Sequence, residues 1–267
     1  MIIAKIIGGL GNQCFQYAAG RHLAEIHSTE LKIDISEFEN YEPHAFSLNH
    51  FNIIEHYASA EEMAELKYVK EKHFHFDPEI LHLPNGIYLH GYWQSEKYFA
   101  SISEIIRHEL AVKSPLSGRD AKMAEQIASC ESVSAHIRRA DYVTKTYTEL
   151  FDPCGLDYYS ASVEQLIRVV QKPHFFVFTD DKTWVRRNFK LPYPMTFVDH
   201  NGPDKNYEDL RLMSLCKHNI IANSTFGWWG AWLNKNPRKM VFAPKKWFTE
   251  IARSSSKDII PDSWIKA

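Results

Sequence analysis

Residues 2–12 read IIAKIIGGLGN, which places a run of β-branched residues directly before a glycine-rich turn. Such a run, with Lys5 as its single charge, is typical of a strand that is buried on both faces of a parallel sheet. The residues of one helical face then recur at 15, 18, 19, 22, 23 and 26. We therefore predict a strand, a glycine turn and a helix capped by Asn12.

The same alternation of strand and helix runs through the second half of the chain. We predict strands at 132–137, 175–179, 196–199, 218–222 and 240–243. Helices are expected between them, at 159–170, from 180 or 181 to 189, at 206–216 and at 226–233. Repeated strand–helix units build a parallel sheet covered by helices on both faces, so the predicted fold class is α/β.

The first half is less regular after a second predicted strand at 31–35. A helical stretch is expected near 60–67, and the rest of 37–84 is predicted to be irregular. The length of 267 residues suits one large domain or two of about 130 residues each. Proline and glycine interrupt the pattern in Ser114–Arg119. We predict an N-terminal domain at 1–115 and a C-terminal domain at 116–267, with the option that the last segment packs back on the first domain.

Composition and charge exclude several classes of protein. A hydrophobic content of 45% with 24% charged residues excludes disordered and fibrous chains. A formal net charge of −2 gives no general attraction to nucleic acid or anionic membranes, so an anion site must come from a local cluster. The four cysteines form no CxxC pair and indicate a reducing compartment. No signal peptide or membrane-spanning run is recognised, and we expect a cytoplasmic protein, peripheral to the inner membrane where its ligand is lipid-linked.

The most informative polar stretch is SAHIRRADY at 134–142, which sets Arg138 and Arg139 at the end of a predicted strand. Arginine carries a rigid fork of donors that never loses its charge, so it binds a phosphate in two-pronged fashion and holds leaving-group charge without a metal. The alternative is a solvated surface pair bridged to Asp141. The neighbouring strands decide between these interpretations.

Three polar segments lie at or just beyond the ends of predicted strands, at 136–141, 179–181 and 222–226. The carboxyl ends of parallel strands meet at one edge of a sheet, where ligands of such folds bind. Ser224 and Thr225 precede a helix and add backbone and hydroxyl donors for an anion. Asp180 is an acceptor for a purine amide edge or a ribose, although capping of the following helix explains the acidic pair equally well.

Eight ordered motifs resemble the bacterial α-1,2-fucosyltransferases of glycosyltransferase family 11. They are IGGLGNQxFQY at 7–17, GYWQSEKYF at 91–99, HxRRxD at 136–141, LDYY at 156–159, FTDD at 178–181 with Trp184, EDL at 208–210, NSTF at 223–226 and WWGAW at 228–232. The resemblance implies a GT-B fold, in which two Rossmann-like domains face each other across a cleft. It also implies inverting transfer of L-fucose from GDP-L-fucose to the 2-hydroxyl of a galactoside, with no cofactor and no metal ion.

The resemblance assigns roles to individual residues. Arg138 and His136 are the implied catalytic residues, Arg138 on the β-phosphate and His136, with Asp180, on the guanosine. Substrate binding is implied for Gly11, Asn12, Arg139, Asp141, Asp180, Asn223, Ser224, Thr225 and Phe226. Among these, Arg139 and Asp141 are expected to form a supporting ion pair, since Arg139 points away from Arg138 in an extended segment. The general base, the natural acceptor glycan and the oligomeric state stay open.

Three other interpretations remain. The glycines at 9 and 11 with an acid at Asp34 imitate a dinucleotide fingerprint, but its third glycine would fall at Cys14. A sugar-binding protein without activity is suggested by Trp228, Trp229 and Trp232, although their helical spacing favours packing. A metal site at His73 and His75 lacks a third ligand.

Overall fold

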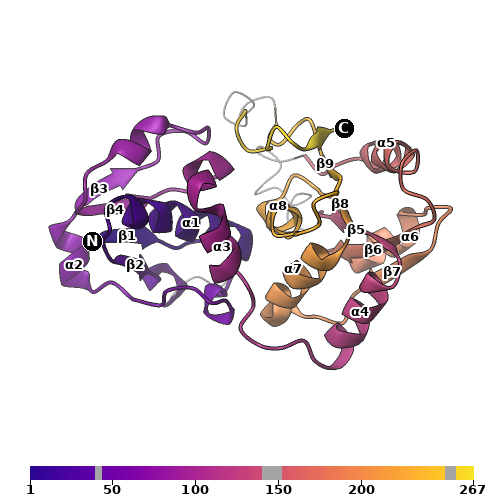
Figure 1. The fold of residues 1–267 in the computed structure, drawn as a ribbon, viewed down its shortest axis with the longest axis horizontal. Coiled ribbons are helices and arrows are strands. Elements are labelled where there is room, and N and C mark those ends of the chain that lie inside the picture. The colour runs from indigo at the N-terminus through magenta and orange to yellow at the C-terminus, as the bar shows by residue number, and fades with distance from the viewer. Residues whose placement is uncertain (40–43, 140–151, 250–256) are drawn as a thin grey trace. The chain divides into compact units, whose positions relative to one another are not determined.

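The computed structural model describes residues 1–39, 44–139, 152–249 and 257–267, which form two compact units (Figure 1). Unit 1 comprises Met1–Ser114 and Ser255–Pro261, and unit 2 comprises Pro115–Ser254 and Asp262–Ala267. Each unit contains its own sheet, and every recorded strand pairing in both sheets is parallel. The predicted α/β class is therefore confirmed.

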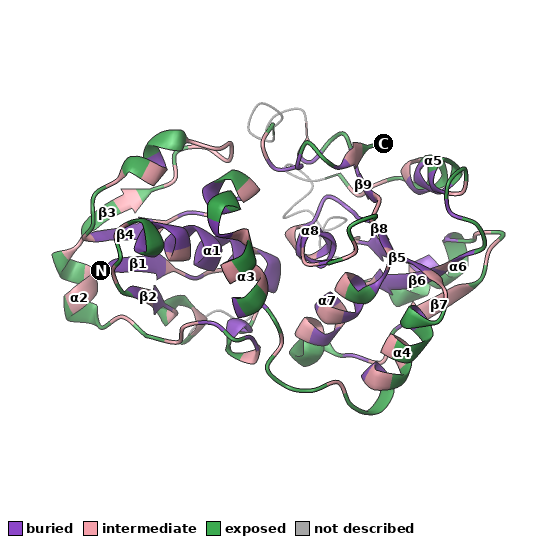
Figure 2. Cartoon of the chain, in the orientation of Figure 1, coloured by how far each residue is buried: buried purple, intermediate pink, exposed green. Residues whose placement is uncertain are grey.

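Unit 1 is built on a four-stranded sheet with the order β2-β1-β4-β3. Its strands are β1 (Ile2–Lys5), β2 (Leu31–Asp34), β3 (Lys67–Lys70) and β4 (Ile87–His90). Its α-helices in the described ranges are α1 (Leu10–Ile26), α2 (Ala60–Glu65) and α3 (Ser103–Glu109), joined by short 3-10 helices at Ser36–Glu39, Leu48–His50, Pro78–His82, Glu96–Tyr98 and Ala100–Ile102. Figure 2 shows β1 and α1 as largely buried elements.

Helix α1 begins earlier than the sequence predicts. Its N-cap is Gly9, and the backbone N–H of Asn12 donates to the Gly9 carbonyl at 2.9 Å. Gly8 has a φ of 74°, which favours glycine and lets the chain turn directly after the strand. The predicted cap at Asn12 is therefore wrong, because Asn12 already lies in the first turn of the helix.

Unit 2 is built on a six-stranded sheet with the order β10-β9-β8-β5-β6-β7. Its strands are β5 (Glu131–Ile137), β6 (Pro173–Thr179), β7 (Met195–Val198), β8 (His218–Ile220), β9 (Val241–Ala243) and β10 (Ile265–Lys266). The helices described in this unit are α4 (Gly118–Ala128), α5 (Leu156–Leu166), α6 (Lys182–Asn188), α7 (Asn206–Leu215) and α8 (Thr225–Trp232), with a 3-10 helix at Pro203–Lys205.

Two apolar clusters cover the faces of this second sheet. Alternate residues of β6 point to opposite sides: Phe175 and Val177 pack with residues of α5 and α6, whereas Phe176 and Phe178 pack with residues of α4 and α7. This alternation is the period of a β-strand buried on both faces. The sheet order reverses at β5, whose chain successor β6 lies on one side and β8 on the other. Ligands of such sheets bind where the order reverses, at the carboxyl ends of the strands.

Candidate functional site

The candidate site lies at this reversal point, where β5 and β8 end side by side. Strand β5 pairs with β8 up to Ala135 and Ile220, and with β6 up to Ile137 and Thr179. Arg138 follows β5 directly, and the segment 221–224 leads from β8 into α8. The local topology therefore brings an arginine and the N-terminus of a helix to one edge of the sheet.

Asp180 holds both arginines of this edge. The parallel register that aligns Ile137 with Thr179 also sets Arg138 beside Asp180. The Arg138 Nε lies 3.0 Å from Asp180 Oδ2, and the Arg139 backbone N–H donates to Asp180 Oδ1 at 2.9 Å. Both carboxylate oxygens are thus engaged by the protein, which orients the Arg138 guanidinium.

The side chain of Arg139 turns toward α6 instead. Its guanidinium carbon lies 3.6 Å from the centroid of the Trp184 ring, a stacking contact that arginine favours. Its Nε lies 3.9 Å from Asp181 Oδ2. The expected partner, Asp141, lies outside the described residues. The observed contacts give Arg139 a supporting place in the site.

His136 is a neutral, buried imidazole. Only 4% of its surface is exposed, and its Nδ1 has no hydrogen-bond partner within the described ranges. Burial, aided by the charge of Arg138, lowers the pKa of His136 to about 3, so the ring carries no charge at neutral pH. A Cβ on Gly227 would come within 2.5 Å of that Nδ1. The ring centroids of His136 and Phe226 lie 5.8 Å apart. The His136 ring can therefore take part in hydrogen bonding but carries no charge at neutral pH.

The residues around the start of α8 divide into a buried, structural part and a partly exposed part. The Asn223 amide donates at 3.0 Å to the carbonyls of Asp152 and Trp247, and its side chain is 2% exposed, so it fixes neighbouring loops. Ser224 is the N-cap of α8 but makes no side-chain capping bond. Thr225 and Phe226 follow in the first turn and are partly exposed. The first N–H groups of α8 thus lie at the same edge as Arg138, the arrangement that favours an anion.

The two remaining predicted residues, Gly11 and Asn12, belong to unit 1. Gly11 is buried and Asn12 is partly exposed, both in the first turn of α1. The Gln94 side-chain amide donates to Asn12 Oδ1 at 3.0 Å. They follow β1 in their own sheet as Arg138 follows β5 in the other.

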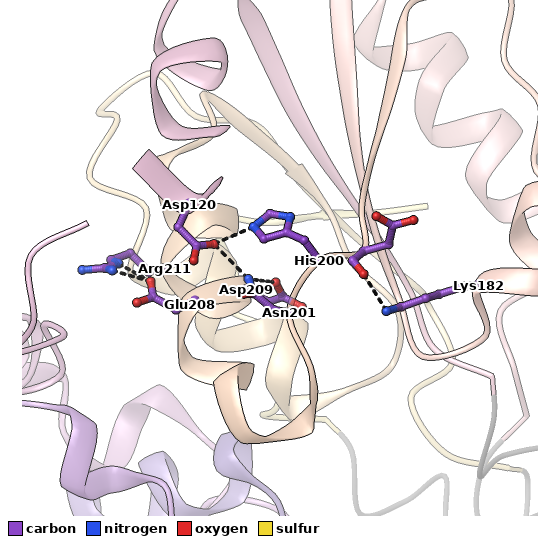
Figure 3. Close-up of polar contacts among 8 residues, drawn as sticks. Asp120, Lys182, His200, Asn201, Glu208, Asp209 and Arg211 are labelled. Carbon is purple, nitrogen blue, oxygen red and sulfur yellow. Dashed lines mark hydrogen bonds and ion pairs between the residues drawn. The ribbon is translucent and has the colours of Figure 1, made fainter. Parts of the chain in front are cut away.

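A carboxylate network beyond β7 is missing from the sequence analysis (Figure 3). The Asn201 side-chain amide donates to Asp120 at 2.9 Å and to Asp209 at 2.8 Å, and His200 lies 2.8 Å from the same Asp120 oxygen. These residues come from α4, the β7–α7 segment and α7. The signal in the sequence is weak, because the bond between Asp120 and Asn201 joins residues 81 positions apart.

The whole chain is similar to one family of known proteins. The model of glycosyl transferase family 11 matches residues 1–267. The chain belongs to glycosyltransferase family 11. An Escherichia coli protein named alpha-1,2-colitosyltransferase is 33% identical, with 100% of this chain and 98% of that protein aligned. The Escherichia coli O-antigen biosynthesis glycosyltransferase WbnK is 30% identical over 97% of each chain.

A solved structure confirms the fold of this family 11 glycosyltransferase. The crystal structure of NodZ alpha-1,6-fucosyltransferase soaked with GDP-fucose matches 90% of this chain and 94% of its own, with a TM-score of 0.57 at 14% identity. The predicted GT-B type of fold is thereby confirmed. At this level of identity the likeness concerns the fold alone.

Within residues 1–39, 44–139, 152–249 and 257–267, no group of three or more His, Cys, Asp or Glu side chains is placed to hold a metal ion. His73 and His75 stack with ring centroids 3.5 Å apart. No helix in the same ranges has the length and apolar character needed to cross a bilayer.

The network of Figure 3 predicts a pH-dependent stability for this glycosyltransferase. Burial, aided by the charge of Asp120, raises the pKa of Asp209 to about 6, although the hydrogen bond from Asn201 opposes the shift. Because folding favours the protonated form of Asp209, its contribution to the free energy of unfolding is fully present below the unfolded pKa of about 4. That contribution is lost as the pH rises through the folded pKa of about 6. Asp209→Asn keeps the acceptor for Asn201 without the charge.

We expect the melting temperature of Asp209→Asn, relative to the unsubstituted protein, to rise by about 2–4 °C between pH 5 and pH 8. Thermal unfolding of both proteins across this range measures the difference. Asp262→Asn, at an exposed carboxylate, controls for the loss of one charge. A difference that stays constant with pH would contradict the prediction.

Proposed function

We propose that this family 11 enzyme transfers L-fucose from GDP-L-fucose to the 2-hydroxyl of a terminal galactoside, with inversion and without a divalent metal. The observation that carries the proposal is Arg138, held by Asp180 at the sheet edge where α8 begins. The relative named alpha-1,2-colitosyltransferase supports the same linkage. The resemblance of the motifs to fucosyltransferases supports the donor.

The reaction breaks the bond between C1 of the sugar and the β-phosphate oxygen, so negative charge develops on GDP. The Arg138 guanidinium and the first N–H groups of α8 are suited to that charge, and each preorganised donor contributes about 2.7–4 kcal/mol. The sugar gains positive character while the acceptor hydroxyl attacks from the opposite face. This single displacement turns the β-linked donor into an α-linked product.

Recognition of the guanine requires an acceptor for its N1–H and amino group. Asp180 is one candidate, because each oxygen of a carboxylate can accept a further hydrogen bond beside those from Arg138 and Arg139. Asp209 is a second candidate, because it lies in the first turn of α7 and bonds to Asn201 beyond the end of β7. His136, neutral at the end of β5, is the proposed support for the nucleoside.

Thermal unfolding in the presence of nucleotides tests the donor class. We expect GDP and GDP-L-fucose to raise the melting temperature, by about 2–4 °C for each kcal/mol of binding free energy, and UDP, CMP and NAD to leave it unchanged. NAD protection without GDP protection would instead favour the oxidoreductase interpretation. Excess chelator in a transfer assay tests the metal-free proposal, since an unchanged rate is expected.

The identity of the transferred sugar needs a second measurement. GDP-L-colitose is the alternative donor, favoured by the 33% identity to the colitosyltransferase. Competition between the two donors for one galactoside separates these candidates. NMR analysis of the anomeric configuration of the product tests inversion. A β-linked product would contradict inversion.

A further inference from the structure

The GYWQ segment at 91–94 lies at the carboxyl edge of the unit 1 sheet and has no role in the donor site described above. It follows β4 directly, and β4 pairs with β1, which precedes the first turn of α1. The two loops meet where Gln94 Nε2 donates to Asn12 Oδ1 at 3.0 Å. They therefore form one polar cluster at the edge where ligands of parallel sheets bind.

The backbone of this segment is held in an unfavourable conformation. Trp93 has a φ of 53°, a left-handed conformation that a bulky residue rarely adopts. The Glu71 carboxylate accepts the backbone N–H groups of Tyr92 at 2.7 Å and of Trp93 at 3.0 Å, and its burial raises its pKa. A Cβ on Gly91 would come within 2.3 Å of Glu71 Cβ, so only glycine fits there.

The other side of the segment is also fixed. The Ser95 hydroxyl donates to the Asp258 carbonyl at 2.9 Å, and the Asp258 carboxylate pairs with Lys97. Gln94 stands between these two restraints. The backbone on both sides of Gln94 is therefore held, and the bond to Asn12 holds its side chain. A side chain fixed in this way meets the condition for a precise binding contact.

Gln94 itself retains an unused acceptor. Only 7% of the residue is exposed, and among the described residues its Oε1 has no hydrogen-bond partner. A buried acceptor without a donor destabilises the fold, so it calls for an explanation beyond stability. Nearby Gln13 shows the contrast: its amide donates to two carbonyls and accepts the Ser47 backbone N–H.

We propose that Gln94, steadied by Asn12, accepts a hydrogen bond from a hydroxyl of the acceptor sugar. This inference rests on the proposed function, because it assigns the subsite for the galactoside that receives the transferred sugar. A hydroxyl supplies the donor that Oε1 lacks. The contact makes Gln94 a specificity residue, since a site built to bond a hydroxyl discriminates strongly against the analogue without it.

The test combines Gln94→Met, which keeps the length of the side chain and removes the acceptor, with a series of methyl β-galactosides lacking the 3-, 4- or 6-hydroxyl. Full-chain enzyme is assayed with GDP-L-fucose as donor. We expect Gln94→Met to lower kcat/KM for the intact galactoside by about tenfold to a hundredfold. One deoxy galactoside should lose a similar factor with the unsubstituted enzyme and lose no more than about threefold further with the variant.

Three comparisons guard this result against a purely structural effect. Gln94→Glu retains an acceptor oxygen but, like Gln94→Met, loses the Nε2 donor to Asn12, so sensitivity to the same missing hydroxyl in this variant would trace the effect to the acceptor oxygen. Gln126→Met, at an exposed glutamine of α4, should behave as the unsubstituted enzyme. The KM for the donor and the rate of donor hydrolysis without acceptor should stay within about threefold in every variant.

Equal losses of Gln94→Met on all galactosides, no loss at all, or an effect confined to the donor KM would each overturn the assignment. Failure of the proposed function is distinct, because the unsubstituted enzyme would then neither hydrolyse nor transfer from GDP-L-fucose. The acceptor series would then be repeated with the donor sugar that the enzyme accepts, and the same coupling would decide the role of Gln94.

Discussion

Arg138→Ala is expected to lower turnover by about a hundredfold or more while leaving the fold intact. Arg138 Nε pairs with Asp180 at the sheet reversal, and its side chain is 26% exposed, so the group is fixed yet accessible. Its guanidinium neutralises charge that develops only as the bond to GDP breaks. The loss should therefore appear mainly in kcat, measured by steady-state transfer from GDP-L-fucose.

Two further variants sharpen the measurement on Arg138. Arg138→Lys keeps the charge but not the planar fork, and we expect an activity between those of the alanine variant and the unsubstituted enzyme. Arg168→Ala removes an exposed arginine just beyond α5 and should leave turnover unchanged. Turnover close to normal in a folded Arg138→Ala variant would refute the leaving-group role.

The second half of the chain was predictable because its buried strands are short apolar runs with clear ends. The run at 175–178 is FFVF, and β6 indeed spans Pro173–Thr179. In unit 1, β3 escaped prediction because its sequence is KYVK and its only partly buried residue is Val69. Pairing with β4 holds β3 in place, and such tertiary support leaves no apolar pattern along the strand.

The site shows the same division between local and long-range information. Arg138 and the N-terminus of α8 were identified because each follows a recognisable strand. The ion pair between Arg138 and Asp180 was not identified, since it depends on the register between β5 and β6. Asn223 illustrates the same limit: the residue type suggests a ligand contact, but its amide bonds to two backbone carbonyls far along the chain.

Asp180→Asn is expected to lower kcat by about tenfold to a hundredfold, because hydrogen bonds to charged groups contribute about 1.5–3 kcal/mol. The asparagine side chain keeps one acceptor for the Arg139 backbone N–H but loses the charge that holds the Arg138 guanidinium. Asp181→Asn is the matched control at the next position. Asp181 caps α6 by accepting the Trp184 N–H at 3.0 Å, which asparagine does equally well, and its 3.9 Å ion pair reaches Arg139 rather than Arg138, so activity should fall much less than in Asp180→Asn.

Asp180 acts through Arg138, which gives the prediction a signature that general damage to the fold would lack. Placed in the Arg138→Ala background, Asp180→Asn should cost little further activity, because the group that it orients is already absent. Additive losses in the double variant would show that Asp180 works independently of the arginine. If Asp180 contacted the nucleotide directly, Asp180→Asn would also raise the Kd for GDP in both backgrounds, so GDP titration of the four proteins separates orientation of Arg138 from contact with the donor.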